Sequence, residues 1–277
     1  MKVLVDGLNN AYRCLVYQLV TSYCKKVGVI YGMLTLVKSY YFKFGVVPII
    51  VWDGKAKFRR EINKNYKLNR IYNNDVALQV EDLKEIFSLL GITQYYNQDY
   101  ECDDVIACLC KKFTSDSIVI ISTDNDFYQL VNERVFIFDP SQGVMLNEES
   151  IKCKTGISPS KFVFYRVLVG DFSDNIKGIP RIRKSDVCSL VTKYSNLDEL
   201  YNRIDEVRSY PLKQNLVNYK ETVYNNYNII RFRDEITLME IEKKVDIEKA
   251  KQLFTKYEFK KFLDNFSFWE KVSSLSK

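Results

Sequence analysis

Short apolar runs that alternate with helical patterns constrain the fold of this chain more than any other feature. The candidate strands are KVLVD (2–6), VVPIIVWD (46–53), ITQYY (92–96) and SIVIISTDND (117–126). Helical spacing lies between them, most clearly in DVALQVEDLKEIFSLLG, where apolar residues share one face and Gly91 marks the end. Strands separated by helices predict an α/β fold with a mostly parallel sheet.

The strand signals weaken along the chain. RVFIFDP and GVMLN favour a hairpin, but from about residue 147 helical patterns dominate, as in KFVFYRVLVG and VYNNYNIIRF. A chain of 277 residues, 47% of them hydrophobic, can bury enough apolar surface for two lobes. We therefore expect an α/β lobe over residues 1–160 and a helical lobe over residues 161–277.

Carboxylates end three of the predicted strands. Asp6 and Asp53 close the first two runs, and Asp124 with Asp126 closes the fourth. Each alone could be a loop or helix-capping aspartate, but the carboxyl ends of parallel strands line one crevice. Two further motifs, ECDD and GDFSDN, add more acids, which are Glu101, Asp103, Asp104, Asp171 and Asp174. The pattern predicts nine acids around a common site.

The chain has no histidine, which excludes histidine bases, Ser-His or Cys-His nucleophile pairs and histidine-ligated metals. Nine adjacent carboxylates could not all stay ionised unaided, because like charges raise one another's pKa values. Oxygen ligands suit Mg²⁺ or Mn²⁺. Two such ions about 4 Å apart can activate a water and stabilise the leaving oxygen of a phosphodiester.

The net charge of +6 is concentrated in one segment. KAKFRREINKNYKLNR (55–70) holds seven Lys or Arg residues and a single acid, Glu61, so its own excess is also +6. Such a run is either a solvated basic helix face or a phosphate-binding element. The seven cysteines form no C-x-x-C pair, which argues against a zinc site and for reduced thiols.

The sequence predicts neither a signal peptide nor a membrane helix. MKVLVDG reaches an acid at its sixth residue, unlike a signal peptide, and no apolar run approaches the roughly 18 residues that a membrane helix needs. We therefore expect a soluble, intracellular (cytoplasmic) protein with no membrane partner.

The acidic blocks VDGLN, VWDG, ECDD, STDND and GDFSDN resemble those of the 5′-nuclease superfamily, in the same order, from about residue 2 to residue 190. This superfamily includes flap endonucleases, phage 5′-3′ exonucleases and the 5′-nuclease domain of bacterial DNA polymerase I. The resemblance implies a PIN-like α/β lobe, a helical arch at about 54–90, and a helix-three-turn-helix at about 165–192 in the helical lobe.

The resemblance also assigns roles to residues. The first metal would be surrounded by Asp6, Asp53, Glu101 and Asp103. The second would be served by Asp104, Asp124, Asp126, Asp171 and Asp174. In the arch, Lys67 matches a lysine that contacts the scissile phosphate, Arg70 matches its partner cation, and Tyr66 is a base-stacking candidate. The other arch residues expected to contact nucleic acid are Lys55, Lys57, Arg59 and Arg60.

The helix-three-turn-helix is expected to hold the duplex backbone through Lys177, Gly178, Arg181, Arg183 and Lys184. The family usually has Ile-Pro-Gly-Ile-Gly here, so Arg181 and Arg183 replace glycines in this chain. The change puts in question the backbone grip on phosphate and the monovalent-cation site that the family often forms there. Arginine side chains in its place predict more salt-dependent binding.

The sequence as a whole predicts a stand-alone, Mg²⁺-dependent 5′-nuclease that acts as a monomer, with two metal ions per site for which Mn²⁺ can substitute. The expected substrates are branched or nicked duplex DNA with a 5′ flap or overhang, together with RNA primers in RNA–DNA hybrids. One alternative is a ribonuclease of the RNase-H-like or PIN type, and another is a non-catalytic protein that binds branched DNA. The complete set of acids argues against the last.

Overall fold

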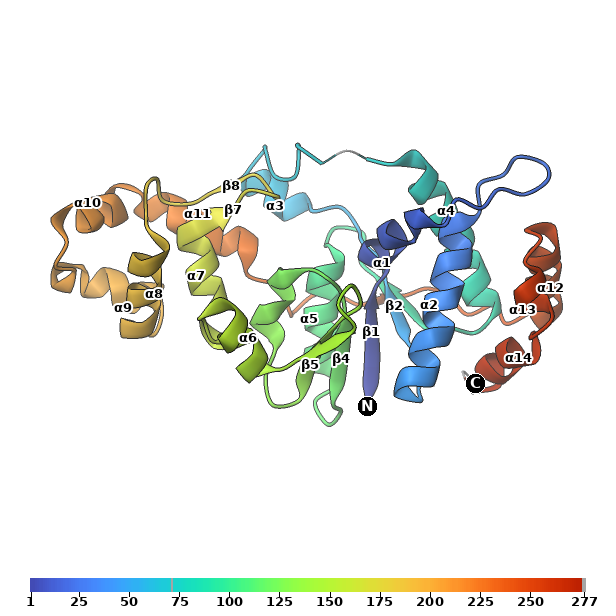
Figure 1. Cartoon of the computed structure of the whole chain (residues 1–277). Helices are drawn as coiled ribbons and strands as arrows, with labels where there is room; N and C mark the ends of the chain where they lie inside the picture. Colours follow the sequence, from blue (N-terminus) through green and yellow to red (C-terminus); the bar gives the residue numbers. More distant parts are fainter. Residues whose placement is uncertain (71, 276–277) are drawn as a thin grey trace.

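The computed structural model of the protein describes residues 1–70 and 72–275. Figure 1 shows an elongated molecule with a central α/β body. A helical lobe that contains α8 (Lys184–Lys193), α9 (Leu197–Asn202) and α10 (Tyr210–Asn218) lies at one end. The C-terminal helices lie at the opposite end, beyond the sheet.

The described residues contain one large sheet of seven strands in the order β6-β5-β4-β1-β2-β3-β9. The five inner strands run parallel, and the edge strands β6 and β9 run antiparallel to their neighbours. The strands are β1 (Lys2–Asp6), β2 (Ile49–Val51), β3 (Gln94–Tyr96), β4 (Ile118–Ile121), β5 (Val135–Asp139), β6 (Val144–Leu146) and β9 (Met239–Glu240). The expected parallel sheet and the expected β5–β6 hairpin are confirmed.

Strands β4, β1 and β2 are adjacent and form the centre of the sheet. Helices cover both faces of the sheet, so these strands can be almost wholly apolar. The register pairs Asp6 with Val51 on one side of β1 and Val5 with Ile121 on the other. The carboxyl ends of the three strands therefore lie level, and the acids that follow them meet at one edge.

Two apolar clusters cover the two faces of the sheet. One face carries α1 (Gly7–Arg13), η1 (Cys14–Val16), α2 (Gly28–Phe44) and α4 (Asn74–Leu89). The other carries α5 (Cys102–Lys112), η2 (Asn125–Leu130) and α6 (Glu148–Thr155). The region expected to form an arch contains α3 (Lys57–Ile62), a series of turns, and then α4.

A third apolar cluster forms the core of the helical lobe and also includes Tyr66 from the arch region. The elements of this part of the chain are η3 (Pro159–Lys161), α7 (Phe162–Val169), β7 (Gly170–Asp171), β8 (Ile176–Lys177), η4 (Ile204–Glu206) and α11 (Lys220–Ile230), with α8 to α10. β7 and β8 pair antiparallel in a separate two-stranded sheet. The loop between them places Asp174 near Asp171.

The C-terminal residues are placed differently from the expected lobe of residues 161–277. β9 joins the edge of the main sheet beside β3. Helices α12 (Ile247–Lys256), α13 (Lys260–Leu263) and α14 (Ser267–Leu275) belong to the cluster that contains α2 and α4. Phe254 and Trp269 are fully buried there, with ring centroids 5.9 Å apart. These aromatic faces need an apolar surface to cover, and the nearest is the outer side of α2 and α4.

Among the described residues, none of the helices is both long enough and apolar enough to span a bilayer.

Candidate functional site

Asp6 is the innermost acid of the sheet edge. It is the last residue of β1 and caps α1, where its carboxylate accepts a hydrogen bond from the Asn9 backbone N–H at 3.1 Å. Its other oxygen accepts a hydrogen bond from the Ser122 hydroxyl, just beyond β4, at 2.8 Å. Asp53, just beyond β2, accepts a hydrogen bond from the Cys102 backbone N–H at 3.1 Å, which ties it to the start of α5.

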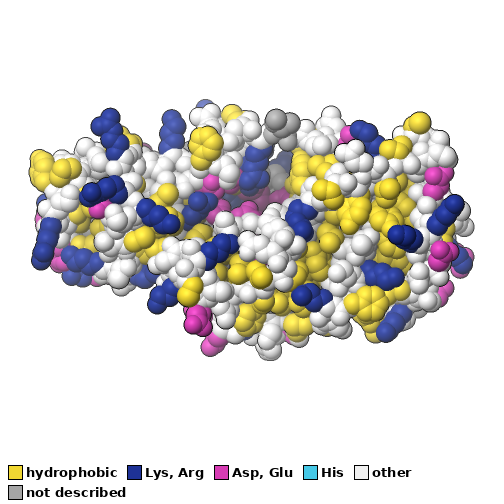
Figure 2. Space-filling model, in the orientation of Figure 1, with side chains coloured by type: hydrophobic (Ala, Val, Ile, Leu, Met, Phe, Trp, Pro, Cys, Tyr) yellow, Lys and Arg dark blue, Asp and Glu magenta, His cyan; other side chains and the backbone are white. Residues whose placement is uncertain are grey.

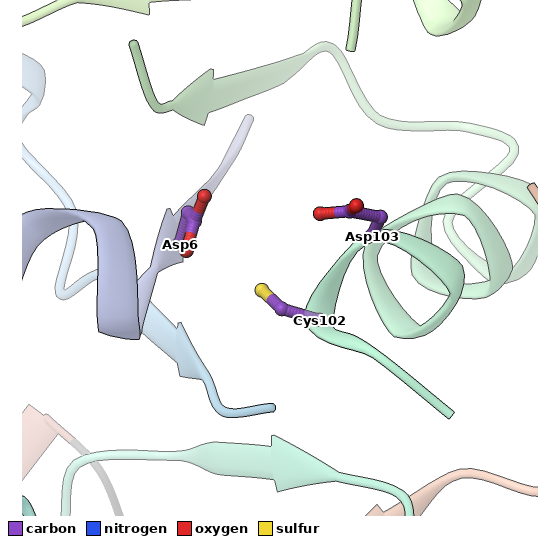
Figure 3. Close-up of side chains that lie close together, drawn as sticks. All are labelled: Asp6, Cys102 and Asp103. Carbon is purple, nitrogen blue, oxygen red and sulfur yellow. The ribbon is translucent and has the colours of Figure 1, made fainter. Parts of the chain in front are cut away.

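Figure 3 shows the first of two groups of candidate metal ligands. Asp103 from α5 points toward Asp6 at the end of β1, with the Cys102 thiol below and between them. One ligand atom from each of the three residues lies within 4.8 Å of the others. The Cys102 thiol hydrogen-bonds the Val51 carbonyl at 3.4 Å, and burial, with Asp6 next to it, raises the thiol pKa well above its usual value. The carboxylate oxygens are therefore the available ligands.

Asp126, Asp171 and Asp174 form the second group, also within 4.8 Å of one another. Asp126 lies in η2, and the other two come from β7 and the loop after it. Arg166 on α7 ion-pairs with two members of this group, through Nε to Asp126 at 3.1 Å and through Nη2 to Asp171. Ser173 donates to Asp171 from both its backbone N–H and its hydroxyl, at 2.9 and 2.7 Å.

The raised pKa values of Asp6, Asp103 and Asp126 reflect negative charge crowded into a buried place. Burial and the neighbouring Asp53 raise the pKa of Asp6 to about 7. Burial and the neighbouring Asp124 raise the pKa of Asp126 to about 7 and that of Asp103 well above its usual value. Divalent cations would relieve this repulsion, so both groups fit hard, oxygen-seeking metal ions.

Glu101 differs from Asp6, Asp103 and Asp126, because three donors hold it ionised. Its carboxylate accepts hydrogen bonds from Lys67 Nζ at 2.6 Å, the Tyr66 hydroxyl at 2.8 Å and Arg59 Nη1 at 3.0 Å. Burial favours the neutral acid, but the charges of Lys67 and Arg59 outweigh burial and lower the pKa of Glu101. Glu101 thus anchors the arch to the start of α5.

A second anchor joins the arch to the loop between β7 and β8. The Lys67 backbone N–H donates to the Asp174 carbonyl at 3.1 Å, and Arg70 ion-pairs with the Asp174 carboxylate. The Asn175 side chain donates to the Asn65 carbonyl at 3.0 Å. Lys67 adopts a left-handed backbone with φ 56°, an uncommon conformation for a residue other than glycine. The turn of residues 63–70 therefore rests directly on the acids.

Arg59 and Asp104 differ from their expected roles. Arg59 is 2% exposed, and its guanidinium makes a bidentate pair with the Asp104 carboxylate, Nη1 at 2.5 Å and Nη2 at 2.8 Å. Asp104 has no exposed surface and also accepts a hydrogen bond from the Arg233 backbone N–H. In this structure Arg59 cannot reach a nucleic acid, and Asp104 is committed to the ion pair instead of a metal. The physical reason is that a buried carboxylate needs a partner for each oxygen.

Tyr66 also differs from its expected role as a base-stacking side chain. Its ring is 3% exposed and packs in the core of the helical lobe. Its hydroxyl lies between two acids, 2.8 Å from Glu101 and 3.3 Å from Asp174. The ring cannot be offered to a base while the hydroxyl satisfies these carboxylates.

The remaining basic residues singled out by sequence lie at the surface. Those in or just before α3 are Lys55, Lys57 and Arg60, and those after β7 are Lys177, Arg181, Arg183 and Lys184. Arg181 has φ 58°, so its backbone adopts the left-handed conformation that glycine favours. Unlike the exposed side chain of Arg181, the guanidinium of Arg183 pairs with the Asp186 carboxylate at 2.9 Å, so it is less available to bind another anion. Gly178 packs so closely that an added Cβ would lie 2.1 Å from the Val169 carbonyl oxygen.

A cavity of about 590 Å³ opens beside the second acid group. Asp124, Asp126 and Asp171 line it together with Arg70, Arg166 and Lys184. Figure 2 shows acidic side chains gathered in a hollow near the middle of the upper rim, with Lys and Arg side chains around it. The hollow therefore has an acidic floor and a basic border. The floor suits metal cations, and the border suits a polyanionic ligand that approaches them.

Sequence reasoning missed two residues that organise the site. Arg166 is the one cation in the apolar helix FVFYRVLV, and that isolation is the signal that could have marked it. Ser122, which donates to Asp6, stands between β4 and Asp124, but a serine there carries no distinctive pattern.

Two family models match the chain. One describes a 5′-3′ exonuclease N-terminal resolvase-like domain and covers residues 1–156, and the other describes a 5′-3′ exonuclease C-terminal SAM fold and covers residues 157–253. A 5′-3′ exonuclease of Buchnera aphidicola subsp. Acyrthosiphon pisum is 34% identical over 77% of this chain and 79% of its own length. A thermostable DNA polymerase I of Thermus filiformis is 29% identical over 95% of this chain but only 33% of the polymerase.

Solved structures share the fold along the whole chain. A T5 5′-exonuclease with bound zinc ions superposes with a TM-score of 0.73 at 17% identity, over 100% of this chain and 99% of the other. Flap endonuclease-1 from Methanococcus jannaschii gives a TM-score of 0.64 at 16% identity, over 100% and 93%. A T5 D15 flap endonuclease variant in complex with DNA and metal ions gives 0.68 at 20%, over 98% of each chain. At sequence identities this low, the superpositions show a shared fold and do not by themselves show a shared function.

Proposed function

Because the chain belongs to the 5′-3′ exonuclease family and is a structure-specific 5′-nuclease, we propose that it hydrolyses phosphodiesters of branched or nicked DNA with the help of Mg²⁺. The observation that carries the proposal is the pair of acid groups together with Lys67 of the arch, which ion-pairs with Glu101, the residue before Cys102, and with Asp174 of the second group. The structures that share this fold include ones whose names state bound DNA and metal ions, which supports the same ligands here.

Two divalent cations, when bound, would supply the polarisation of the phosphodiester and the activation of the attacking water. The first would be held by Asp6 and Asp103, with Asp53 and Glu101 at its border. The second would be held by Asp126, Asp171 and Asp174, with Asp124 beside them. The donors are carboxylate oxygens, and the chain has no histidine, so Mg²⁺ or Mn²⁺ suits the site better than zinc does.

Lys67 and Arg70 are the residues placed to receive the phosphate. Burial disfavours the ammonium form of Lys67, but the neighbouring Tyr66 and Glu101 outweigh burial and raise its pKa well above the usual value. Lys67 is therefore a permanent cation that donates hydrogen bonds and is no base. Its Nζ lies 2.6 Å from Glu101 and 3.6 Å from Asp174, which belongs to the second acid group. From there it can neutralise charge that develops on the transferring phosphate.

The duplex would lie along the turn after β8. Lys177, Arg181 and Lys184 expose cations there, and the tightly packed Gly178 holds the turn close to α7. Such contacts recognise backbone geometry and not base sequence. We assign catalysis to the α/β lobe of about residues 1–160, with its arch, and duplex binding to the helical elements that follow. The C-terminal helices α12 to α14 support the catalytic lobe.

The test uses a 5′-flap duplex and a nicked duplex, each incubated with the full chain in Mg²⁺, in Ca²⁺ and in EDTA. Cleavage is expected in Mg²⁺ alone, and Asp126→Asn and Asp174→Asn are each expected to slow it by orders of magnitude. Asp205→Asn is the matched control, because Asp205 is an exposed acid of the helical lobe whose carboxylate pairs with Lys213 at the surface. Calorimetric titration of Mg²⁺ without DNA gives a second readout of the acid groups.

Two outcomes would contradict the proposal. Equal cleavage in Mg²⁺ and in EDTA would show that the reaction needs no divalent metal. Wild-type rates in both aspartate variants would show that Asp126 and Asp174 have no role in cleavage. Flaps made of RNA, tested in parallel, separate a DNA flap nuclease from a ribonuclease on the same fold.

A further inference from the structure

Phe172 is the most exposed large apolar side chain in the described part of the chain, with 94% of its surface open. A single exposed apolar residue usually needs no explanation. This one stands between Asp171 and Asp174, whose carboxylates belong to the second acid group. An aromatic ring of this size therefore projects from the rim of the candidate metal centre.

The loop that carries the ring is held firmly on both sides. Asp171 accepts two hydrogen bonds from Ser173, at 2.9 and 2.7 Å. The Phe172 carbonyl accepts one from the Asn175 backbone N–H at 3.2 Å and one from the Asn69 side chain at 3.4 Å. A ring on a fixed loop loses little conformational entropy when a ligand covers it, so it is prepared for binding.

The contact with Asn69 also sets what can approach the ring. It joins the Phe172 loop to the turn of residues 63–70, which carries Lys67 and Arg70. Leu68, in the same turn, is 69% exposed. A phosphate that binds Lys67, Arg70 and metal ions held by the acids carries a sugar and a base with it. That base would lie within about one nucleotide of the Phe172 ring. The ligand therefore includes a flat aromatic group.

We propose that Phe172 stacks on the unpaired nucleobase next to the scissile phosphate and so helps to select branched DNA over continuous duplex. A base inside a duplex already has neighbours on both faces, whereas an unpaired base at a junction has a free face to offer. Stacking on an aromatic side chain is tolerant of base identity, which suits an enzyme that reads structure. The inference rests on the proposed function, because it assumes that DNA enters this site.

The experiment places 2-aminopurine at the unpaired position beside the junction of a 5′-flap duplex, with Ca²⁺ in place of Mg²⁺. Its fluorescence is quenched when the base stacks. Binding of the wild type is expected to quench it, Phe172→Ala to leave it bright, and Phe172→Trp to restore the quenching. Phe172→Ala is also expected to weaken flap binding by about 5- to 100-fold, the effect of losing one base–aromatic stack.

Phe42 provides the matched control. It is 67% exposed and lies on α2, where its ring stacks on Phe268 and not beside the acids. Phe42→Ala is expected to quench the 2-aminopurine fluorescence and to bind the flap duplex as the wild type does. Thermal unfolding of Phe172→Ala should match the wild type, because the ring packs against so little, and this separates a binding effect from misfolding.

Two results would overturn the inference alone while wild-type cleavage stands. One is unchanged quenching with Phe172→Ala, and the other is quenching only when 2-aminopurine occupies the last base pair of the duplex. If the wild type neither binds nor cuts the flap, the proposed function fails, and this inference fails with it.

Discussion

Arg59 and Asp104 form a fully buried bidentate ion pair that joins α3 to α5, and Arg59 Nε also donates to the Ile229 carbonyl on α11 at 2.8 Å. One side chain thus connects the foot of the arch, helix α5 beside the sheet, and α11 of the helical lobe. Asp103, the neighbour of Asp104, points instead into the first acid group. Two adjacent acids of the ECDD motif therefore have separate tasks, one structural and one at the site.

Asp104→Asn is expected to destabilise the fold by about 3–5 kcal/mol, because it leaves the buried Arg59 charge without its partner. Asp103→Asn should leave stability unchanged or improved, since it removes one of several buried charges that repel each other, and it should abolish cleavage. Denaturant unfolding and cleavage assays on both variants check this. Equal unfolding midpoints for the wild type and Asp104→Asn would contradict the assignment.

The metal-free protein should lose stability as the pH rises from about 4 to about 7. Burial and neighbouring acids raise the pKa values of Asp6 and Asp126 to about 7, so in this range the folded state binds more protons than the unfolded state does. Glu101 has a lowered pKa, so its opposite effect falls at lower pH. Thermal unfolding in EDTA is therefore expected to show a higher midpoint at pH 5.5 than at pH 8.

Addition of Mg²⁺ at pH 8 should recover the lost stability, because the cations replace the protons. A midpoint in EDTA that rises from pH 5.5 to pH 8 would show that burial and the neighbouring acids do not raise the pKa values of Asp6 and Asp126.

Lys67→Ala is expected to slow cleavage by orders of magnitude at saturating DNA while duplex binding changes little, because the ammonium lies over the acids. Lys64→Ala, an exposed lysine of the same turn, is the matched control and should cut at close to the wild-type rate. Single-turnover cleavage and filter binding separate the two quantities. Loss of binding equal to the loss of rate would make Lys67 a simple phosphate anchor.

Arg181→Gly should raise stability by about 1 kcal/mol, because φ 58° is strained for arginine and free for glycine. If the Arg181 guanidinium contacts phosphate, the same change should reduce the slope of log affinity against log salt by about 0.9. Arg183→Ala is the comparison, since its guanidinium pairs with Asp186. DNA affinity measured from low to high salt tests this prediction. An unaltered slope with Arg181→Gly would show that Arg181 does not contact the DNA.

The sequence by itself determined the parallel sheet and the strand ends at which Asp6, Asp53 and Asp124 meet. Strand periodicity and the level ends of adjacent parallel strands are local or nearly local properties, so they can be read from spacing alone. The order of the acidic blocks likewise pointed to the family that the comparisons show.

Only the tertiary structure decided which charged residues face each other. Arg59 belongs to a basic run that looks like a surface, yet it is 2% exposed because a buried carboxylate on α5 requires it. Tyr66 lies between acids from two separate segments, and α12 to α14 return to the sheet because its flanking helices offer the nearest apolar surface. Pairing and burial of this kind depend on contacts between residues far apart in sequence, such as the 45-residue separation of Arg59 and Asp104 and the 35-residue separation of Tyr66 and Glu101, and no local pattern encodes them.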